Sequence, residues 1–335
     1  MEKKLYLHLG LHKTSSSSFQ ATCKANASFL SDQGITYPLF KCKQTFREDI
    51  SNHSLPIFSL FSGKAAKYHI NIRRGITDVA AANAEYMSQL DQILASSEKV
   101  ILSGEDIGVL NDRGLNRLKA SVLKHNYSII PFALVRDPYN FMNSAYQQMI
   151  KSGNYNSLIS LGSIAESKVD NDLTLPNRNR AIQSILNVFR DSAQFYPFRK
   201  ACEYNGGPVR FILEYICGVK NISTITMCRK NESRSNIWTR VQNQLNKVYP
   251  AIINGKPNLE HKKLKKNLYR DLGDKFILTE SEFNMIRDPF KIHEEIMHSL
   301  LGDDFMEKSY TFSDTISNEI IDKVISDYPA FAAEQ

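Results

Sequence analysis

The sequence predicts an α/β protein, in which a central parallel sheet is flanked by helices and the C-terminal part is largely helical. Short apolar runs alternate with stretches whose apolar residues recur at helical spacing. The 335 residues suffice for one large α/β domain with insertions or for two modest domains. Strands separated by helices pair in parallel, and ligands collect at their carboxyl ends. Lys13, Glu105 and Arg136 all fall at such ends, which points to one site.

The expected elements follow from these patterns in chain order. Buried strands are expected at 4–10, 98–107, 128–135 and 192–198. Helices are expected at 18–34, 79–96, 112–125, directly after the strand that ends at 135, at 177–189, at 210–219, and over most of the chain beyond. Two polar stretches are expected to be irregular and are interpreted as substrate-facing segments, namely 40–75 and 152–178.

Residues 5–20 (LYLHLGLHKTSSSSFQ) are the most informative stretch of the chain. They predict a buried strand, a tight turn with Lys13 and four serines, and the start of a helix. Exposed amides, the helix dipole and the lysine together favour a phosphate or sulfate at this point. A Walker A loop ending at Lys13 would need glycines at positions 7 and 12, where this chain has Leu7 and His12. An ATP or GTP hydrolase is therefore disfavoured.

A second strand–turn–helix segment spans 129–153 (IIPFALVRDPYNFMNSAYQQMIKSG). Its apolar run ends at Arg136, and the helix that follows carries Ser144. An arginine at a strand end offers a planar fork to a phosphate, and a serine two turns into the helix can bond the same group. The alternative is that Arg136 pairs with Asp137 and that Ser144 is an ordinary helix residue.

These two segments resemble the anion-binding elements of sulfotransferases that use 3′-phosphoadenosine 5′-phosphosulfate (PAPS). The first resembles the 5′-phosphosulfate loop, K-[ST]-G-[ST]-[ST] after a hydrophobic strand. The residues of this chain that match or replace its positions are Lys13, Thr14, Ser15, Ser16, Ser17 and Ser18. Ser15 stands where the family has glycine, which is unfavourable if the position needs a positive φ. The second resembles the 3′-phosphate element R-[DE]-P-x(5)-S-x-Y, with matches at Arg136, Ser144 and Tyr146.

The resemblance implies a P-loop-NTPase-like sulfotransferase fold and a single domain over 1–335. The PAPS-binding core would cover 1–153, and 154–335 would add helical and acceptor-side elements. It also implies PAPS as the donor cosubstrate, no metal, and transfer of a sulfuryl group to a hydroxyl, expected on a carbohydrate or glycan. A weaker similarity at 228–236 implies that Arg229 and Lys230 close over the 3′-phosphate or adenine. An exposed charged turn is the alternative there.

Sulfuryl transfer needs a base for the acceptor proton and a cation for the charge that builds on the leaving phosphate. Lys13 is our candidate for the cation. Glu105 is our candidate for the base, and it resembles the glutamate after the equivalent strand in bacterial and Golgi-type enzymes. Asp106 could replace it, and His12 is the other candidate. His8, inside the first strand, is interpreted as a core residue.

Composition bounds the partners of the chain. Five cysteines, an odd number without C-x-x-C spacing, favour reduced thiols and a cytoplasmic location. The first apolar run is too short for a secretory signal, and no segment is expected to cross a membrane. The net charge of +7 suits anionic ligands, although no nucleic-acid motif accompanies it.

Two questions stay open at this stage. The lysine-rich run at 256–266 is either a solvated helix face or a docking patch for an anionic polysaccharide or a membrane surface. The rival functions are a small-molecule kinase, which would need a magnesium-binding carboxylate and a complete phosphate loop, and a catalytically silent nucleotide-binding protein. The sequence does not define the oligomeric state.

Overall fold

The computed structural model describes residues 2–45, 49–161, 167, 169, 174–230, 233–254, 256–266, 273–314 and 316–327. The chain packs into two compact units. Unit 1 comprises Met1–Arg136 and Arg178–Asn231, and unit 2 comprises Asp137–Asn177 and Glu232–Gln335. The boundary between the units therefore differs from residue 153, where the expected PAPS-binding core ends. The assignment of the whole chain to a single domain stays a prediction.

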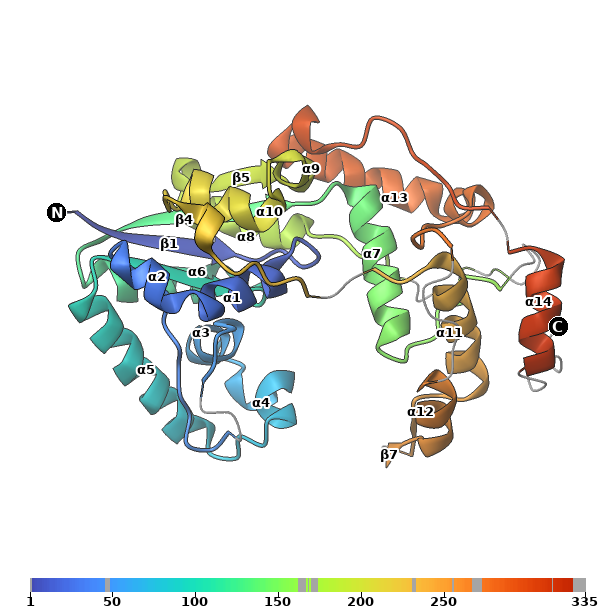
Figure 1. Ribbon diagram of the computed structural model, residues 1–335, viewed down its shortest axis with the longest axis horizontal. Helices are drawn as coiled ribbons and strands as arrows, with labels where there is room; N and C mark the ends of the chain where they lie inside the picture. Colours follow the sequence, from blue (N-terminus) through green and yellow to red (C-terminus); the bar gives the residue numbers. More distant parts are fainter. Residues whose placement is uncertain are drawn as a thin grey trace. The chain divides into compact units, whose positions relative to one another are not determined.

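Unit 1 is built on a five-stranded sheet in the order β2-β3-β1-β4-β5, with every paired neighbour parallel (Figure 1). The strands are β1 (Lys3–Leu9), β2 (Ile35–Thr36), β3 (Lys99–Gly104), β4 (Tyr127–Val135) and β5 (Gln194–Pro197). Helices flank this sheet, so the predicted α/β class is confirmed. β1 lies at the centre, and the chain reaches β2 and β3 on one side of it and β4 and β5 on the other. The loop after β1 therefore lies where the strand order reverses, which is where ligands bind in open parallel sheets.

The helices of unit 1 connect these strands. They are α1 (Ser16–Ala25), α2 (Ala27–Asp32), α3 (Ser54–Phe61), α4 (His69–Arg73), α5 (Val79–Ser96), α6 (Asp112–Leu123), α8 (Asn179–Phe189), α9 (Phe198–Glu203) and α10 (Gly207–Arg210). Single turns complete the unit: the 3₁₀ segments η1 (Ala65–Lys67), η3 (Arg190–Ser192) and η5 (Ile222–Thr224), and the π-helical segment η4 (Phe211–Ile216).

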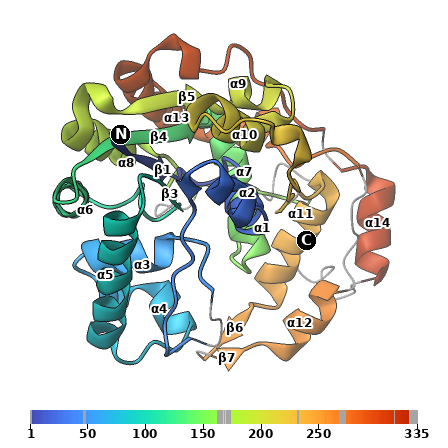
Figure 2. The ribbon, with the colours of Figure 1, turned by 60° about the vertical axis from the view of Figure 1, so that its left-hand side comes forward.

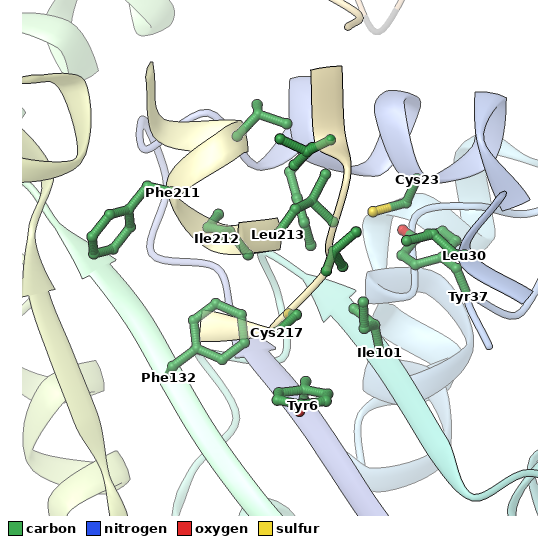
Figure 3. Packing of buried hydrophobic residues seen from close by; sticks show 14 of the residues in the cluster. Tyr6, Cys23, Leu30, Tyr37, Ile101, Phe132, Phe211, Ile212, Leu213 and Cys217 are labelled. Atoms are coloured by element: carbon green, nitrogen blue, oxygen red, sulfur yellow. The ribbon is translucent and has the colours of Figure 1, made fainter. Parts of the chain in front are cut away.

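The core of unit 1 joins the central strands to the helices on one face of the sheet. Figure 3 shows Tyr6, Ile101 and Phe132, one residue from each of β1, β3 and β4, packed beneath Ile212 and Leu213 of η4. β1 is buried throughout Leu5–Leu9 and β3 throughout Val100–Gly104, because a parallel strand at the centre of a sheet is covered on both faces. This rigid core fixes the strand ends from which the loops leave.

Two expectations for unit 1 need correction. Residues 40–75 are not irregular throughout, since α3 and α4 lie within them. Most side chains of α3 are buried on all sides, so its sequence lacks the amphipathic period that identifies a surface helix. The helix expected at 18–34 is split at Asn26, whose side-chain amide donates to the Thr22 carbonyl (2.7 Å).

Unit 2 is mainly helical, as predicted for the C-terminal part. Its elements are α7 (Pro138–Lys151), α11 (Asn236–Val248), α12 (Leu259–Lys266), α13 (Glu280–Leu301), η6 (Asp303–Phe305), α14 (Asn318–Asp327) and an antiparallel hairpin of β6 (Ile252–Ile253) and β7 (Lys256–Pro257). A fully buried ion pair joins α11 to α13, because Arg240 donates to both carboxylate oxygens of Glu282 at 2.6 and 2.9 Å. Of the stretch expected to be irregular at 152–178, residues 162–166, 168 and 170–173 lie outside the described part.

Candidate functional site

The loop between β1 and α1 has an unusual backbone. Lys13 has φ 71° and Ser15 has φ 63°, so both lie in the left-handed region. The place at which the sulfotransferase loop carries glycine thus has a positive φ in this chain, although the residue is serine. Ser15 directly precedes α1 and makes no side-chain hydrogen bond that caps the helix. The amides of the first helical turn have no partners within the helix, and they offer donors to an anion.

The hydroxyls of this loop differ in what they contact. Thr14 is buried and donates to the Leu11 carbonyl, which holds the turn together. Ser18 accepts the Lys230 amide at 2.9 Å. Ser16 is 1% exposed, and its Oγ has no hydrogen-bond partner among the described residues. A Cβ at position 10 would come within 2.9 Å of that Oγ, so glycine there is needed for the strand end to approach α1. A bound anion would give the buried Ser16 hydroxyl the hydrogen-bond partner that the described residues do not supply.

A cluster of charged side chains lies at the ends of β1 and β3. His12 Nδ1 is 3.2 Å from Glu105 Oε2, and His12 Nε2 is 3.9 Å from Asp106 Oδ1. The Asp106 carboxylate also accepts a hydrogen bond from the Tyr68 hydroxyl. Parallel pairing of β1 with β3, in which Leu9 lies opposite Gly104, brings these residues together from distant parts of the sequence. The two candidate bases, Glu105 and His12, are thus in direct contact.

The electrostatics of this cluster keep Glu105 ionised. Burial raises the pKa of the Glu105 carboxyl, but the hydrogen bond and charge of His12 and the charge of Lys13 together lower it by more, so the pKa lies below its ordinary value of 4.5. Lys13 is therefore close enough to Glu105 to act on its charge. At neutral pH the site holds a carboxylate beside an imidazole and a lysine.

Arg178 is a functional candidate that the sequence did not reveal. It precedes α8, and the charges of Glu105 and Asp106 raise the pKa of its guanidinium, although burial lowers it by more. The guanidinium therefore lies within electrostatic range of both carboxylates. In the sequence, Arg178 is one of two arginines in NRNR, and nothing there distinguishes it from Arg180. Glu105, whose charge acts on Arg178, is 73 residues away in the sequence.

His8 lies beneath the loop, in the core, as predicted. Its ring is completely buried, stacks on Phe132 at a centroid distance of 5.0 Å, and contacts Ser103 Oγ through Nδ1 at 2.8 Å. Burial lowers the pKa of His8 to about 4, although the charge of Glu105 acts in the opposite direction. His8 is therefore neutral at pH 7, and Nε2 has no hydrogen-bond partner among the described residues.

The two members of the expected 3′-phosphate element lie in different units. Arg136 directly follows β4 in unit 1, and its guanidinium lies over the Phe198 ring at 4.9 Å. Ser144 lies in α7 of unit 2 and is partly buried. Asp137 caps α7, because its carboxylate accepts the Asn140 amide at 2.8 Å. A shared phosphate between Arg136 and Ser144 stays a prediction.

Arg229 and Lys230 belong to an extended segment that lies along α1. Two polar side chains one turn apart on α1, and a third on Asn26 directly after it, accept the backbone amides of alternate residues in this segment: Ser18 from Lys230, Thr22 from Cys228 and Asn26 from Thr226, at 2.9–3.0 Å. A rise of about 6 Å over four helical residues matches about 6.6 Å over two extended residues, so the ladder stays in register. This ladder places Lys230 beside the first turn of α1, where the anion is expected.

Comparison with known proteins gives no relative. No family model, no curated protein and no solved structure matches this chain. Within the described residues, no group of three or more histidine, cysteine or acidic side chains could hold a metal ion. No helix in the same part of the chain has both the length and the apolar character needed to cross a membrane. Fold and site together define an α/β protein with a candidate anion-binding loop after its first strand.

Proposed function

We propose that this protein is a sulfotransferase that moves the sulfuryl group of PAPS to a hydroxyl acceptor. The observation that carries the proposal is the left-handed Lys13–Ser15 loop at the start of α1, directly beside the ionised Glu105 and its His12 partner. An anion-binding loop next to a carboxylate that can accept a proton is the pair of elements that this reaction requires.

The residues of the loop fit the sulfate-bearing end of the donor. The buried Ser16 hydroxyl and the first amides of α1 supply hydrogen-bond donors, and Lys13 supplies a full positive charge. When bound, PAPS supplies an activated sulfuryl group. Lys13 then stabilises the negative charge on the leaving phosphate. Arg136 would bind the 3′-phosphate end of the nucleotide with its guanidinium, in the role that the resemblance gives it, and Arg229 and Lys230 would cover the nucleotide.

The acceptor hydroxyl would lose its proton to the His12–Glu105 pair. Either member can serve as the base. In the first arrangement Glu105 takes the proton and His12 orients its carboxylate. In the second, Glu105 accepts the Nδ1–H of His12, and Nε2 takes the proton. Asp106 is the weaker candidate because its carboxylate already binds the Tyr68 hydroxyl.

The acceptor class in our proposal is a saccharide or glycan hydroxyl. We propose a cytoplasmic location, since all five cysteines are free thiols and three of them are buried.

Thermal unfolding with and without nucleotide tests the proposal. A ligand that binds only the folded state at about 100 times Kd adds about 2.7 kcal/mol, which corresponds to roughly 5–10 °C in Tm for a unit of this size. We expect that shift with adenosine 3′,5′-bisphosphate and none with ATP and magnesium. Equal shifts, or a larger one with ATP and magnesium, would contradict the proposal and favour a kinase. A bisphosphate shift without transfer of labelled sulfate to any saccharide in a panel would favour a silent nucleotide-binding protein.

A further inference from the structure

Unit 2 carries a surface on which exposed apolar and basic side chains occur together. It consists of the β6–β7 hairpin and α12, and we call it the hairpin surface (Figure 2). Ile252, Ile253 and Leu259 are 65%, 49% and 77% exposed. Residues 252–266 contain five lysines and one glutamate. Scattered single exposed apolar residues are ordinary, but three within eight residues among lysines are not.

The hairpin surface is held in place by specific contacts. Asn258 donates its amide to the Ala251 carbonyl at 2.9 Å, and its side chain accepts the Glu260 amide at 3.0 Å at the start of α12. On the inner face of α12, the buried His261 contacts Asn246 of α11 at 2.9 Å. Lys265 donates to the Lys151 carbonyl at the end of α7. The exposed isoleucines therefore lie on an element that is held in place by hydrogen bonds to the rest of unit 2.

The same contacts determine which face of α12 is presented to solvent. His261 and Leu264 lie on the inner face, and Leu264 packs against the Trp238 cluster. Lys262 and Lys263 follow Leu259 by three and four residues, so the three side chains share the opposite face, and all three are exposed. This helix thus turns a leucine and two lysines outward together.

We propose that the hairpin surface docks this protein on an anionic lipid bilayer. Apolar side chains at an interface insert into the boundary between headgroups and acyl chains, while neighbouring lysines bind the negative lipid surface. Ile252, Ile253 and Leu259 supply the first component, and Lys256, Lys262 and Lys263 supply the second. Neither component suffices alone, since each lysine adds little and three partly inserted side chains give only weak binding.

Charge argues against the other partners for this surface. Two copies would bring lysines against lysines, which repel. A nucleic acid would leave the isoleucines and Leu259 without a partner, because phosphate binding uses only the cations. An anionic bilayer satisfies both kinds of side chain. The proposal is independent of the sulfotransferase assignment.

Vesicle flotation of the full chain tests the proposal. We expect binding to vesicles of phosphatidylcholine with 30% phosphatidylserine, binding at least ten-fold weaker to pure phosphatidylcholine, and loss of binding at 0.5 M salt. Lys262→Gln/Lys263→Gln should weaken binding by about 25-fold, at roughly five-fold per lysine. Ile252→Asn/Ile253→Asn should weaken it by at least ten-fold.

A matched control uses another exposed leucine and lysine. Leu123 ends α6 of unit 1 and Lys124 follows it, and Leu123→Asn/Lys124→Gln should bind vesicles like the native chain. Lys13→Ala should also bind normally, which separates this proposal from the nucleotide site. Unchanged circular dichroism and Tm show that each variant folds. Absence of binding to the anionic vesicles, equal binding to both kinds, or native binding by both hairpin variants would overturn the proposal. A concentration-dependent dimer that the isoleucine variant abolishes would do the same.

Discussion

The imidazole of His12 and the carboxylate of Glu105 lie 3.2 Å apart, although 93 positions separate them in the sequence. Parallel pairing of β1 and β3 brings them together, since each residue follows the end of its strand by a few positions. The second ring nitrogen of His12 lies 3.9 Å from Asp106, so the ring spans two successive carboxylates. In the proposed reaction His12 and Glu105 would therefore act as a pair, whichever of the two takes the proton.

A double-mutant cycle tests this pairing. His12→Asn and Glu105→Gln should each lower kcat by about 10²-fold or more, the usual contribution of a positioned base. Because the two residues act as a unit, the double variant should be no slower than the slower single variant. Single-turnover rates with saturating donor measure this. Losses that multiply would show that His12 and Glu105 act independently. Asp106→Asn, which changes the neighbouring carboxylate, is the control and should cost less.

The pH dependence of kcat/KM distinguishes the two members of the pair. The pKa of Glu105 lies below 4.5, so the carboxylate is present above that pH and is lost as the pH falls through its pKa. With Glu105 as the base, activity should therefore persist down to about pH 4.5 before its acid limb begins. Initial rates after a rapid pH jump, with activity recovered on return to pH 7, avoid losses from unfolding. An acid limb that begins well above pH 4.5 would identify His12 as the base instead.

Replacement of Lys13 should affect chemistry, whereas replacement of Arg136 should affect donor binding. Lys13→Ala removes the charge that stabilises the leaving phosphate, and we expect a loss of about 10²–10³-fold or more in kcat. Arg136→Ala should mainly raise the KM for PAPS. Lys24→Ala, an exposed lysine in the last turn of α1, is the control and should have native kinetics. Full activity in Lys13→Ala would refute the mechanism.

The elements that the sequence predicted well have a local signal. β1, β3 and β4 are continuous apolar runs, and α5 begins and ends within the predicted bounds. β2 is only two residues long, and its place in the sheet depends on pairing with β3. A strand of two residues is too short to show a sequence pattern, and its pairing with a distant strand cannot be read from the local sequence.

In the candidate site, too, the sequence predicts residues that have a local signal and misses those whose position depends on long-range contacts. Lys13 and Glu105 were found because each follows a strand, and the ends of parallel strands meet at one edge. Arg178 was missed because its approach to Glu105 depends on the path of the chain through unit 1. Ser18 is expected to bind the anion, which stays a prediction, and the motif does not reveal that its hydroxyl also accepts an amide 212 residues away. Long-range contacts of this kind have no counterpart in a motif.

Ser15 offers a test of the loop's conformation. Its left-handed backbone costs a serine about 1–2 kcal/mol, whereas glycine loses only about 0.5–1 kcal/mol through unfolded-state entropy. Ser15→Gly should therefore raise the free energy of unfolding by up to about 1 kcal/mol, and Ser15→Val should lower it by more than that. Ser17→Gly is the control. Ser17 lies within α1, where glycine is unfavourable, so this variant should lower the free energy of unfolding by up to about 1 kcal/mol. Urea unfolding measures all three variants. Destabilisation by Ser15→Gly would show that the residue is not left-handed in solution.

Two buried histidines should make unit 1 sensitive to acid. Burial lowers the pKa of His8 and of His53 to about 4 in the folded chain, whereas an unfolded histidine titrates near 6.5. Between these values the unfolded chain binds more protons, so stability is complete above about pH 6.5 and falls as the pH drops toward 4. The expected loss from pH 7 to pH 5 is about 2 kcal/mol for each histidine.

Urea unfolding at the two pH values measures that loss. His8→Gln removes one of the titrating rings, so it should lower the stability at pH 7 but remove about half of the pH dependence. The remaining half belongs to His53, which is held by the Ser103 amide and the Pro38 carbonyl at 2.8 Å each. His69→Gln, at an exposed position on α4, is the control and should keep the native pH dependence. A slope between pH 7 and 5 that His8→Gln leaves intact would show that His8 is not held neutral beneath the loop.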